Sequence, residues 1–238
     1  MKKILLITAF ISISFFSQSQ ILITLLFGDK LNSDGLEFGL EGGMNMSTIS
    51  GLETNKYLNT FNLGFYFDIR IKNQWSVYTG VLVKSNLGVE KLTDNDMKRL
   101  SAKIYTDVNK TNLVGTYHQK LNYFLVPVFL KYKFKNHIYI ETGPQFGLMY
   151  KSWIEFNTNI DGYDGTLKEY NRDDINKIEV GAAIGVGYKL LKGKGWTIGL
   201  KYYYGFVDVY KNISNTKNSS LFIKLNIPVG AGKKKDEK

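Results

Sequence analysis

The stretch FNLGFYFDIRIK, residues 61–72, decides the fold, because apolar residues occupy every second position along its whole length. The positions between them hold Asn, Gly, Tyr, Asp, Arg and Lys. Successive side chains of a β-strand point to opposite faces, so the stretch predicts a long strand with one apolar and one polar face.

The same period of two recurs along the rest of the chain, in residues 36–46, 75–83, 124–134, 138–150, 178–188, 196–206 and 221–229. With residues 61–72 these segments make eight predicted strands. Most are longer than the five or six residues usual in soluble proteins, and their lengths match the 9–11 residues with which a tilted strand crosses a bilayer.

The connections between these strands alternate in length. Short ones are expected at residues 72–74, 135–137 and 191–195, and longer ones at about 50–58, 89–120, 151–176 and 209–219. All short turns therefore fall at the end of the sheet that also holds both chain ends. Short periplasmic turns and long outer loops are typical of outer-membrane barrels, so we predict an all-β, eight-stranded antiparallel transmembrane β-barrel with up-and-down meander topology.

The polar face of the strands indicates which side meets lipid. Charged residues at this density cannot face hydrocarbon, where an Arg or Lys costs about 2–4 kcal/mol at the midplane. We therefore expect them to line the lumen as a plug of paired charges, since eight strands enclose only enough room for side chains or one small ligand. The candidate lumen residues are Glu41, Asp68, Arg70, Lys84, Lys131, Glu141, Glu179 and Lys201.

Aromatic residues on the apolar face support the same orientation. An expected periplasmic girdle next to the short turns consists of Trp75, Tyr132, Phe134, Tyr188 and Trp196, and an opposite girdle of Phe61, Phe124, Tyr150 and Phe206. The alternative is a soluble, lipocalin-like barrel with its apolar face inside. That barrel would expose an almost entirely charged outer face and bury aromatic rings at its rims without need.

The amino terminus resembles an export signal. Lys2 and Lys3 precede the apolar stretch 4–16 and the small-residue sequence Ser17-Gln18-Ser19, which predicts cleavage after about Ser19. The alternative is one uncleaved membrane helix reaching to residue 27, which four consecutive polar residues oppose. The predicted organisation is a signal peptide at 1–19, a periplasmic segment at 20–35, the barrel at 36–230 and a charged tail at 231–238.

Composition excludes several classes of function. The 238 residues contain no cysteine, which removes disulfide frameworks, thiolate metal sites and cysteine nucleophiles. The net charge of +10 is spread over turns, lumen and tail without a basic stripe carrying aromatics, so nucleic-acid binding is not predicted. Neither a cofactor nor a metal is predicted.

The two histidines are the best candidates for catalysis, and they offer little. His118 is expected near the outer end of a strand and His137 in a short turn, both as solvated loop residues. No nucleophile and base converge on either in the sequence, so no catalytic residue is predicted.

Several segments resemble the PorT-like outer-membrane β-barrel family of Bacteroidetes-type bacteria. They are residues 26–32 (LFGDKLN), 123–132 (YFLVPVFLKY), 141–144 (ETGP), 181–188 and 201–205 (KYYYG). The resemblance implies the barrel architecture and an outer-membrane location. One named member of that family is linked to a protein-secretion system, a role that fold-level analogy alone does not transfer.

The predicted function is that of a non-enzymatic structural or adaptor protein that binds through its extracellular loops. Expected partners are outer-membrane lipid, lipopolysaccharide, and secretion-system or surface proteins, because loops carry function more often than scaffolds do. One alternative is a narrow channel for small solutes through the charged lumen. Another is an outer-membrane enzyme that modifies lipid.

Overall fold

The computed structural model describes residues 33, 35–106, 111–160, 162–193 and 195–229. The strands are β1 (Leu36–Ile49), β2 (Leu58–Lys72), β3 (Trp75–Leu92), β4 (Thr116–Lys133), β5 (Ile138–Ile160), β6 (Tyr163–Tyr170), β7 (Ile178–Lys189), β8 (Thr197–Asp208) and β9 (Lys217–Pro228). Short helical segments are α2 (Asp94–Arg99), η1 (Arg172–Asp174) and α3 (Leu190–Gly193). Among the described residues, no helix has the length and apolarity needed to cross a membrane.

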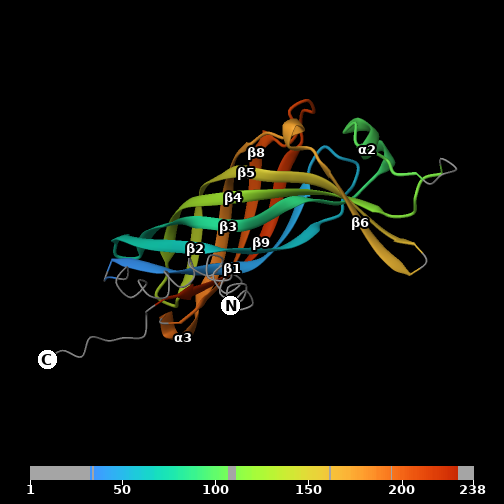
Figure 1. Cartoon of the computed structure of the whole chain (residues 1–238). Coiled ribbons are helices and arrows are strands. Elements are labelled where there is room, and N and C mark those ends of the chain that lie inside the picture. The colour runs from blue at the N-terminus through green and yellow to red at the C-terminus, as the bar shows by residue number, and fades with distance from the viewer. Residues whose placement is uncertain (1–32, 34, 107–110, 161, 194, 230–238) are drawn as a thin grey trace, which may run out of the picture.

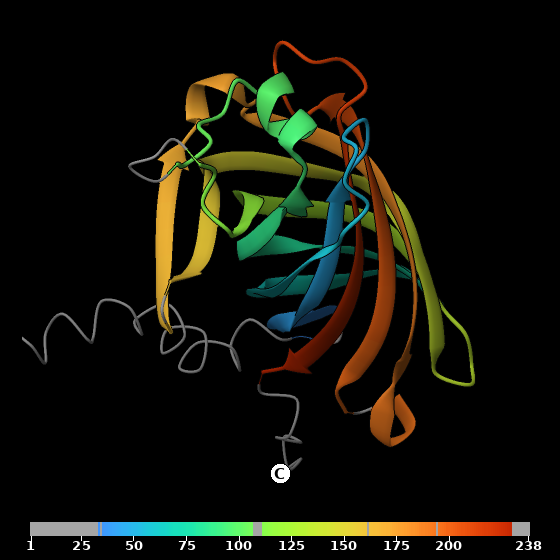
Figure 2. The ribbon, with the colours of Figure 1, turned by 90° about the vertical axis from the view of Figure 1, so that its right-hand side faces the viewer.

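Eight of the strands close into a barrel (Figures 1 and 2), which confirms the predicted fold class. The hydrogen-bonded order is β4-β3-β2-β1-β9-β8-β7-β5, and β4 pairs with β5 to complete the ring. Every pairing in the ring is antiparallel. The short turns and α3 lie at one end of the barrel, and α2 and β6 lie at the other (Figure 1).

The side chains divide between the two faces as the alternation predicts. Tyr66, Tyr78 and Phe129 are almost completely buried inside the barrel, whereas Ile184 and Leu200 lie on the outside with 64% and 48% of their surface exposed. In water such a band of exposed apolar side chains would be unfavourable, and in a bilayer it faces acyl chains.

The ninth strand corrects the predicted loop at 151–176. β5 continues to Ile160, ten residues beyond the predicted end of the strand, and β6 folds back on it as a hairpin outside the ring. The alternation fails as a signal here because side chains are buried on both faces of Ser152–Phe156. A bulge also adds Tyr150 opposite the step between Asn122 and Tyr123, which shifts the phase of every later residue.

The predicted loop at 89–120 is also partly ordered structure. The short helix α2 begins with a capping box, in which the Thr93 hydroxyl accepts from the Asp96 backbone N–H at 3.0 Å and the Asp96 carboxylate accepts from Thr93 N–H at 3.1 Å. Asp96 also accepts from the backbone N–H groups of Glu53 and Thr54, which joins α2 to the connection between β1 and β2. The Met97 side chain of α2 is fully buried in the hydrophobic core that continues from the barrel.

We predict that Ile184→Arg destabilises the barrel by about 2–4 kcal/mol, because this side chain lies near the middle of the apolar band. The measurement is guanidinium unfolding in lipid vesicles. Tyr163→Arg, on the exposed hairpin outside the ring, serves as the control and should change the free energy of unfolding by less than about 0.5 kcal/mol. Equal effects of the two substitutions would contradict the membrane orientation.

Candidate functional site

Buried charges fill the middle of the barrel lumen. The Lys224 ammonium lies 2.5 Å from the Glu141 carboxylate, and both side chains are about 2% exposed or less. Lys201 donates to the Gln145 side-chain oxygen at 2.9 Å, and Tyr78 donates to Glu41. Because each charge has a charged or polar neighbour at contact distance, the lumen is held as a connected network.

Aromatic rings complete this plug. The Lys224 ammonium lies 4.0 Å from the centre of the Tyr78 ring, and the Lys131 ammonium lies 4.0 Å from that of Tyr139. Lys201 lies 4.3 Å from the Phe222 ring centre. Cations desolvated in this way are stabilised by the faces of the rings. Sequence reasoning missed these tyrosines as plug components, although Tyr78 and Tyr139 stand at polar-face positions of their strands.

Six of the eight candidate lumen residues are buried inside the barrel: Glu41, Asp68, Lys131, Glu141, Glu179 and Lys201. Glu179 accepts hydrogen bonds from Tyr203 at 2.7 Å and Asn218 at 2.8 Å. Arg70 lies at the mouth of the lumen and is exposed.

Lys84 does not face the lumen, so its assignment is wrong. A bulge in β3 lets Gly64 pair with Leu82 and Leu63 with Lys84, which leaves Val83 as an extra residue. The extra residue reverses the alternation, so Lys84 is exposed on the outer face and Ser85 is buried.

The five candidate girdle residues lie near the short-turn end of the barrel, on its outer face. The Trp75 and Tyr132 rings are 4.8 Å apart, and the Tyr132 and Phe134 rings are 4.9 Å apart, both edge to face. Tyr188 and Trp196 are also exposed there. Their role as a membrane girdle stays a prediction.

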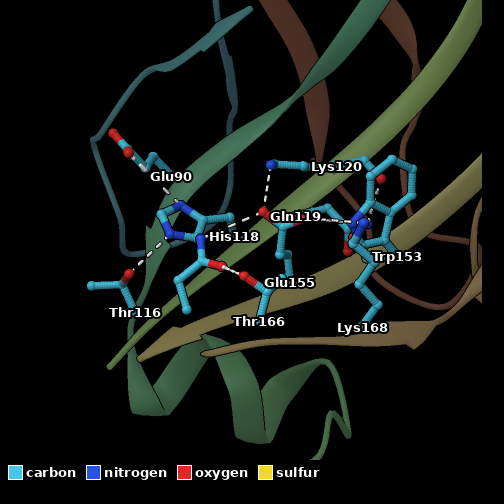
Figure 3. Close-up of polar contacts among 10 residues, drawn as sticks. Glu90, Thr116, His118, Gln119, Lys120, Trp153, Glu155, Thr166 and Lys168 are labelled. Carbon is cyan, nitrogen blue, oxygen red and sulfur yellow. Dashed lines mark hydrogen bonds and ion pairs between the residues drawn. The ribbon is translucent and has the colours of Figure 1, made fainter. Parts of the chain in front are cut away.

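A second polar cluster joins β4, β5 and β6 through the contacts of Lys120 and Lys168 with Glu155 (Figure 3). It begins past Phe124 and Tyr150, whose rings stack at 4.6 Å and mark the outer end of the apolar band on these strands. Glu155 is its centre, since this carboxylate accepts from Lys120 at 2.5 Å and from the Trp153 indole at 3.0 Å. Burial raises the pKa of Glu155, but the hydrogen bonds from Lys120 and Trp153 outweigh it and lower the pKa overall.

Cations surround the Trp153 ring in this cluster. The ammonium groups of Lys151 and Lys168 each lie 5.4 Å from the centre of that ring, and Lys151 lies 5.3 Å from the Tyr170 ring. Trp153 pairs across the sheet with Lys120 on one side and with Tyr170 on the other. We call Lys120, Lys151, Trp153, Lys168 and Tyr170 the basic aromatic surface.

His118 is buried in β4, which corrects its assignment as a solvated loop residue; His137 does lie in a short turn. One His118 nitrogen lies 2.9 Å from the Thr116 hydroxyl and the other 3.8 Å from the Glu90 carboxylate (Figure 3). His118 precedes Phe124, at the end of the apolar band, by six positions, which is about 20 Å along the strand. His118 and Glu90 therefore lie well beyond the apolar band. This position gives no support to a lipid-modifying site.

The pKa of His118 predicts a pH-dependent stability of this cluster. Burial lowers the pKa of the imidazole, and although Glu90 raises it, the result lies below the usual histidine value. The unfolded strand therefore binds a proton more readily than the folded one. The stabilisation is complete above about pH 6.5 and is lost as the pH falls through the folded pKa.

We predict that amide hydrogen exchange of residues 116–121 accelerates on acidification more in the native protein than in His118→Gln. The rates are compared after correction for intrinsic exchange. His137→Gln is the matched control and should behave like the native chain. An unchanged pH dependence in His118→Gln would assign the effect to other groups.

Comparison with known proteins adds a family. The sequence model described as "Outer membrane protein beta-barrel domain" matches residues 16–211. No curated protein matches the chain significantly.

Similar solved structures include Ail of Yersinia pestis in complex with the heparin analogue sucrose octasulfate, with 12% identity, a TM-score of 0.42 and coverage of 82% of this chain and 99% of that one. Neisserial surface protein A has 10% identity, a TM-score of 0.40 and coverage of 82% and 97%. CarO of Acinetobacter baumannii has 9% identity, a TM-score of 0.40 and coverage of 80% and 97%.

Proposed function

The chain belongs to the outer membrane protein beta-barrel domain family, and from this membership we propose that it is a non-enzymatic binding protein of the bacterial outer membrane. The single observation that carries the proposal is the contrast between the two parts of the barrel. The lumen is filled by buried ion pairs, whereas the outer ends of β4 and β5, with β6, form an additional sheet beyond the eight-stranded ring. The barrel then serves as an anchor and the sheet as the binding element.

The filled lumen favours binding over conduction. Glu41, Lys131, Glu141, Lys201 and Lys224 come from five different strands and are each 3% exposed or less. An ion could pass only if these contacts broke, which would leave desolvated charges unpaired. The narrow channel remains the alternative to be tested.

We predict that the purified protein gives no steady current in planar bilayers, because the Lys224–Glu141 ion pair and its neighbours close the lumen. Glu141→Gln should also show no ion-selective current. The alternative is supported by an ohmic current in the native protein whose cation-to-anion preference changes in Glu141→Gln.

The basic aromatic surface is proposed to bind lipopolysaccharide in the outer leaflet. Lys151 follows Tyr150 directly, so its ammonium lies just above the apolar band, at the height expected of glycolipid phosphates. The patch carries three lysines around one carboxylate, Glu155, which leaves a net positive charge. The exposed Tyr170 ring adds a flat surface of the kind that packs on sugars.

We predict that Lys151→Gln with Lys168→Gln weakens binding to lipopolysaccharide-containing nanodiscs by about fivefold per lysine, from about 1 kcal/mol per cation near an anionic surface. Binding is measured as the rise in unfolding temperature relative to phosphatidylcholine nanodiscs. Lys98→Gln, on the exposed face of α2, is the control. An equal loss of binding in the control would show that the overall charge of the protein, and not this surface, causes the effect.

A role in protein secretion is a more specific proposal, and it rests on the PorT-like resemblance alone. The hairpin formed by β5 and β6 presents Tyr163 and Tyr170, which are 80% and 62% exposed, for contact with a partner. Crosslinked pull-down from intact outer membranes should recover a secretion component with the native protein, and not with Tyr163→Ser combined with Tyr170→Ser. Recovery of lipid alone, or equal recovery with both chains, would reject the link.

The signal peptide at 1–19, the periplasmic segment at 20–35 and the tail at 231–238 also remain proposals. All of these residues except Ser33 and Gly35 lie outside the described part of the chain. β1 begins at Leu36 and the last strand ends at Pro228, close to the expected limits of the barrel.

A further inference from the structure

A pocket of about 340 Å³ opens at the short-turn end of the barrel. The plug separates it from the sheet formed by the outer ends of β4 and β5 with β6. The charged lining of the pocket comes from four strands and consists of Glu37, Asp68, Arg70, Lys131, Lys133 and Lys189. The volume falls within the range of about 300–1,000 Å³ typical of small-ligand sites.

The charges of this lining do not balance. Lys131 and Lys133 both contact Asp68, at 3.1 Å and 2.8 Å, and Lys189 contacts Glu37. The four cations therefore face two carboxylates, which leaves an excess of two positive charges. Arg70 has no ion-pair partner among the residues that the structure describes.

The inner end of the pocket is formed by the plug itself. Lys131 and Tyr139 line the pocket, and the Lys131 ammonium lies against the Tyr139 ring. The Tyr139 hydroxyl itself is buried beside Gly187 and Gly199 and does not open into the pocket. A recess with an excess of one sign of charge attracts ions of the opposite sign and raises their local concentration.

We propose that this pocket binds a small oxyanion, a carboxylate or phosphate group, from the periplasmic side. The guanidinium of Arg70 provides two parallel N–H donors that match the geometry of either group. Lys133 and Lys189 add positive charge. The bound anion would neutralise the excess charge that the two carboxylates of the lining leave uncompensated.

This site is independent of the proposed binding to lipopolysaccharide. It lies at the opposite end of the barrel, and no residue of the basic aromatic surface lines it. Loss of one activity should therefore leave the other intact, which makes failure of either proposal recognisable.

The test is calorimetric titration of the full-length protein in detergent micelles with inorganic phosphate and, separately, with acetate, at constant ionic strength in chloride. We expect saturable binding of at least one of the two anions, and the stronger one identifies the ligand class. Arg70→Gln should weaken binding by about tenfold or more, as for loss of a charge-assisted hydrogen-bonding group. Arg70→Lys should restore part of it.

Lys72→Gln is the matched control, because Lys72 is an exposed cation of the same strand end that does not line the pocket. It should bind the anion as the native protein does. The proposal is overturned if neither anion binds, or if Arg70→Gln and Lys72→Gln weaken binding equally. Arg70 is exposed and has no ion-pair partner among the described residues, so we expect Arg70→Gln without anion to unfold at the same temperature as the native protein.

Discussion

Satisfaction of backbone hydrogen bonds inside a bilayer is the constraint on which the rest of this structure depends. Hydrocarbon offers no partner to an unpaired N–H or C=O group, so a sheet can cross a membrane only when its first and last strands meet. Here β1 pairs with β9 from Gly39↔Pro228 to Ile49↔Asn218, and β4 pairs with β5 along nearly its whole length. With every ring strand paired on both sides, the sheet leaves no ring edge exposed to lipid.

Closure with eight strands determines what the lumen contains. The interior is so narrow that large side chains need glycine opposite them. A Cβ atom at Gly187 or Gly199 would lie 2.4 Å or 2.3 Å from the Tyr139 hydroxyl oxygen, closer than van der Waals contact allows. The glycines of β7 and β8 thus make room for the tyrosines and lysines of the plug, and the same small diameter favours contact between opposite charges.

The barrel was predictable from sequence because its signal is local. Alternation along residues 61–72 or 178–188 is imposed by lipid on one side and a polar lumen on the other, so each strand can be recognised alone. Lys84 and the β5–β6 hairpin were not predictable in this way. Both follow a bulge, and a bulge is defined by pairing with a distant strand, which the pattern of one segment does not record. The pairs Lys224–Glu141 and Lys131–Asp68 depend on barrel register for the same reason.

The extra residue at Tyr150 has a consequence for how deeply the protein sits in the membrane. Tyr150 and Lys151 are neighbours in the chain, yet the bulge places the aromatic ring and the ammonium group on the same side of the barrel wall. The change from an apolar to a charged outer surface is therefore completed within a single peptide unit. Without the bulge, strict alternation through Tyr150 would turn Lys151 toward the interior and Ser152 outward, and this part of the wall would lose the charged group that sets its height against the lipid headgroups.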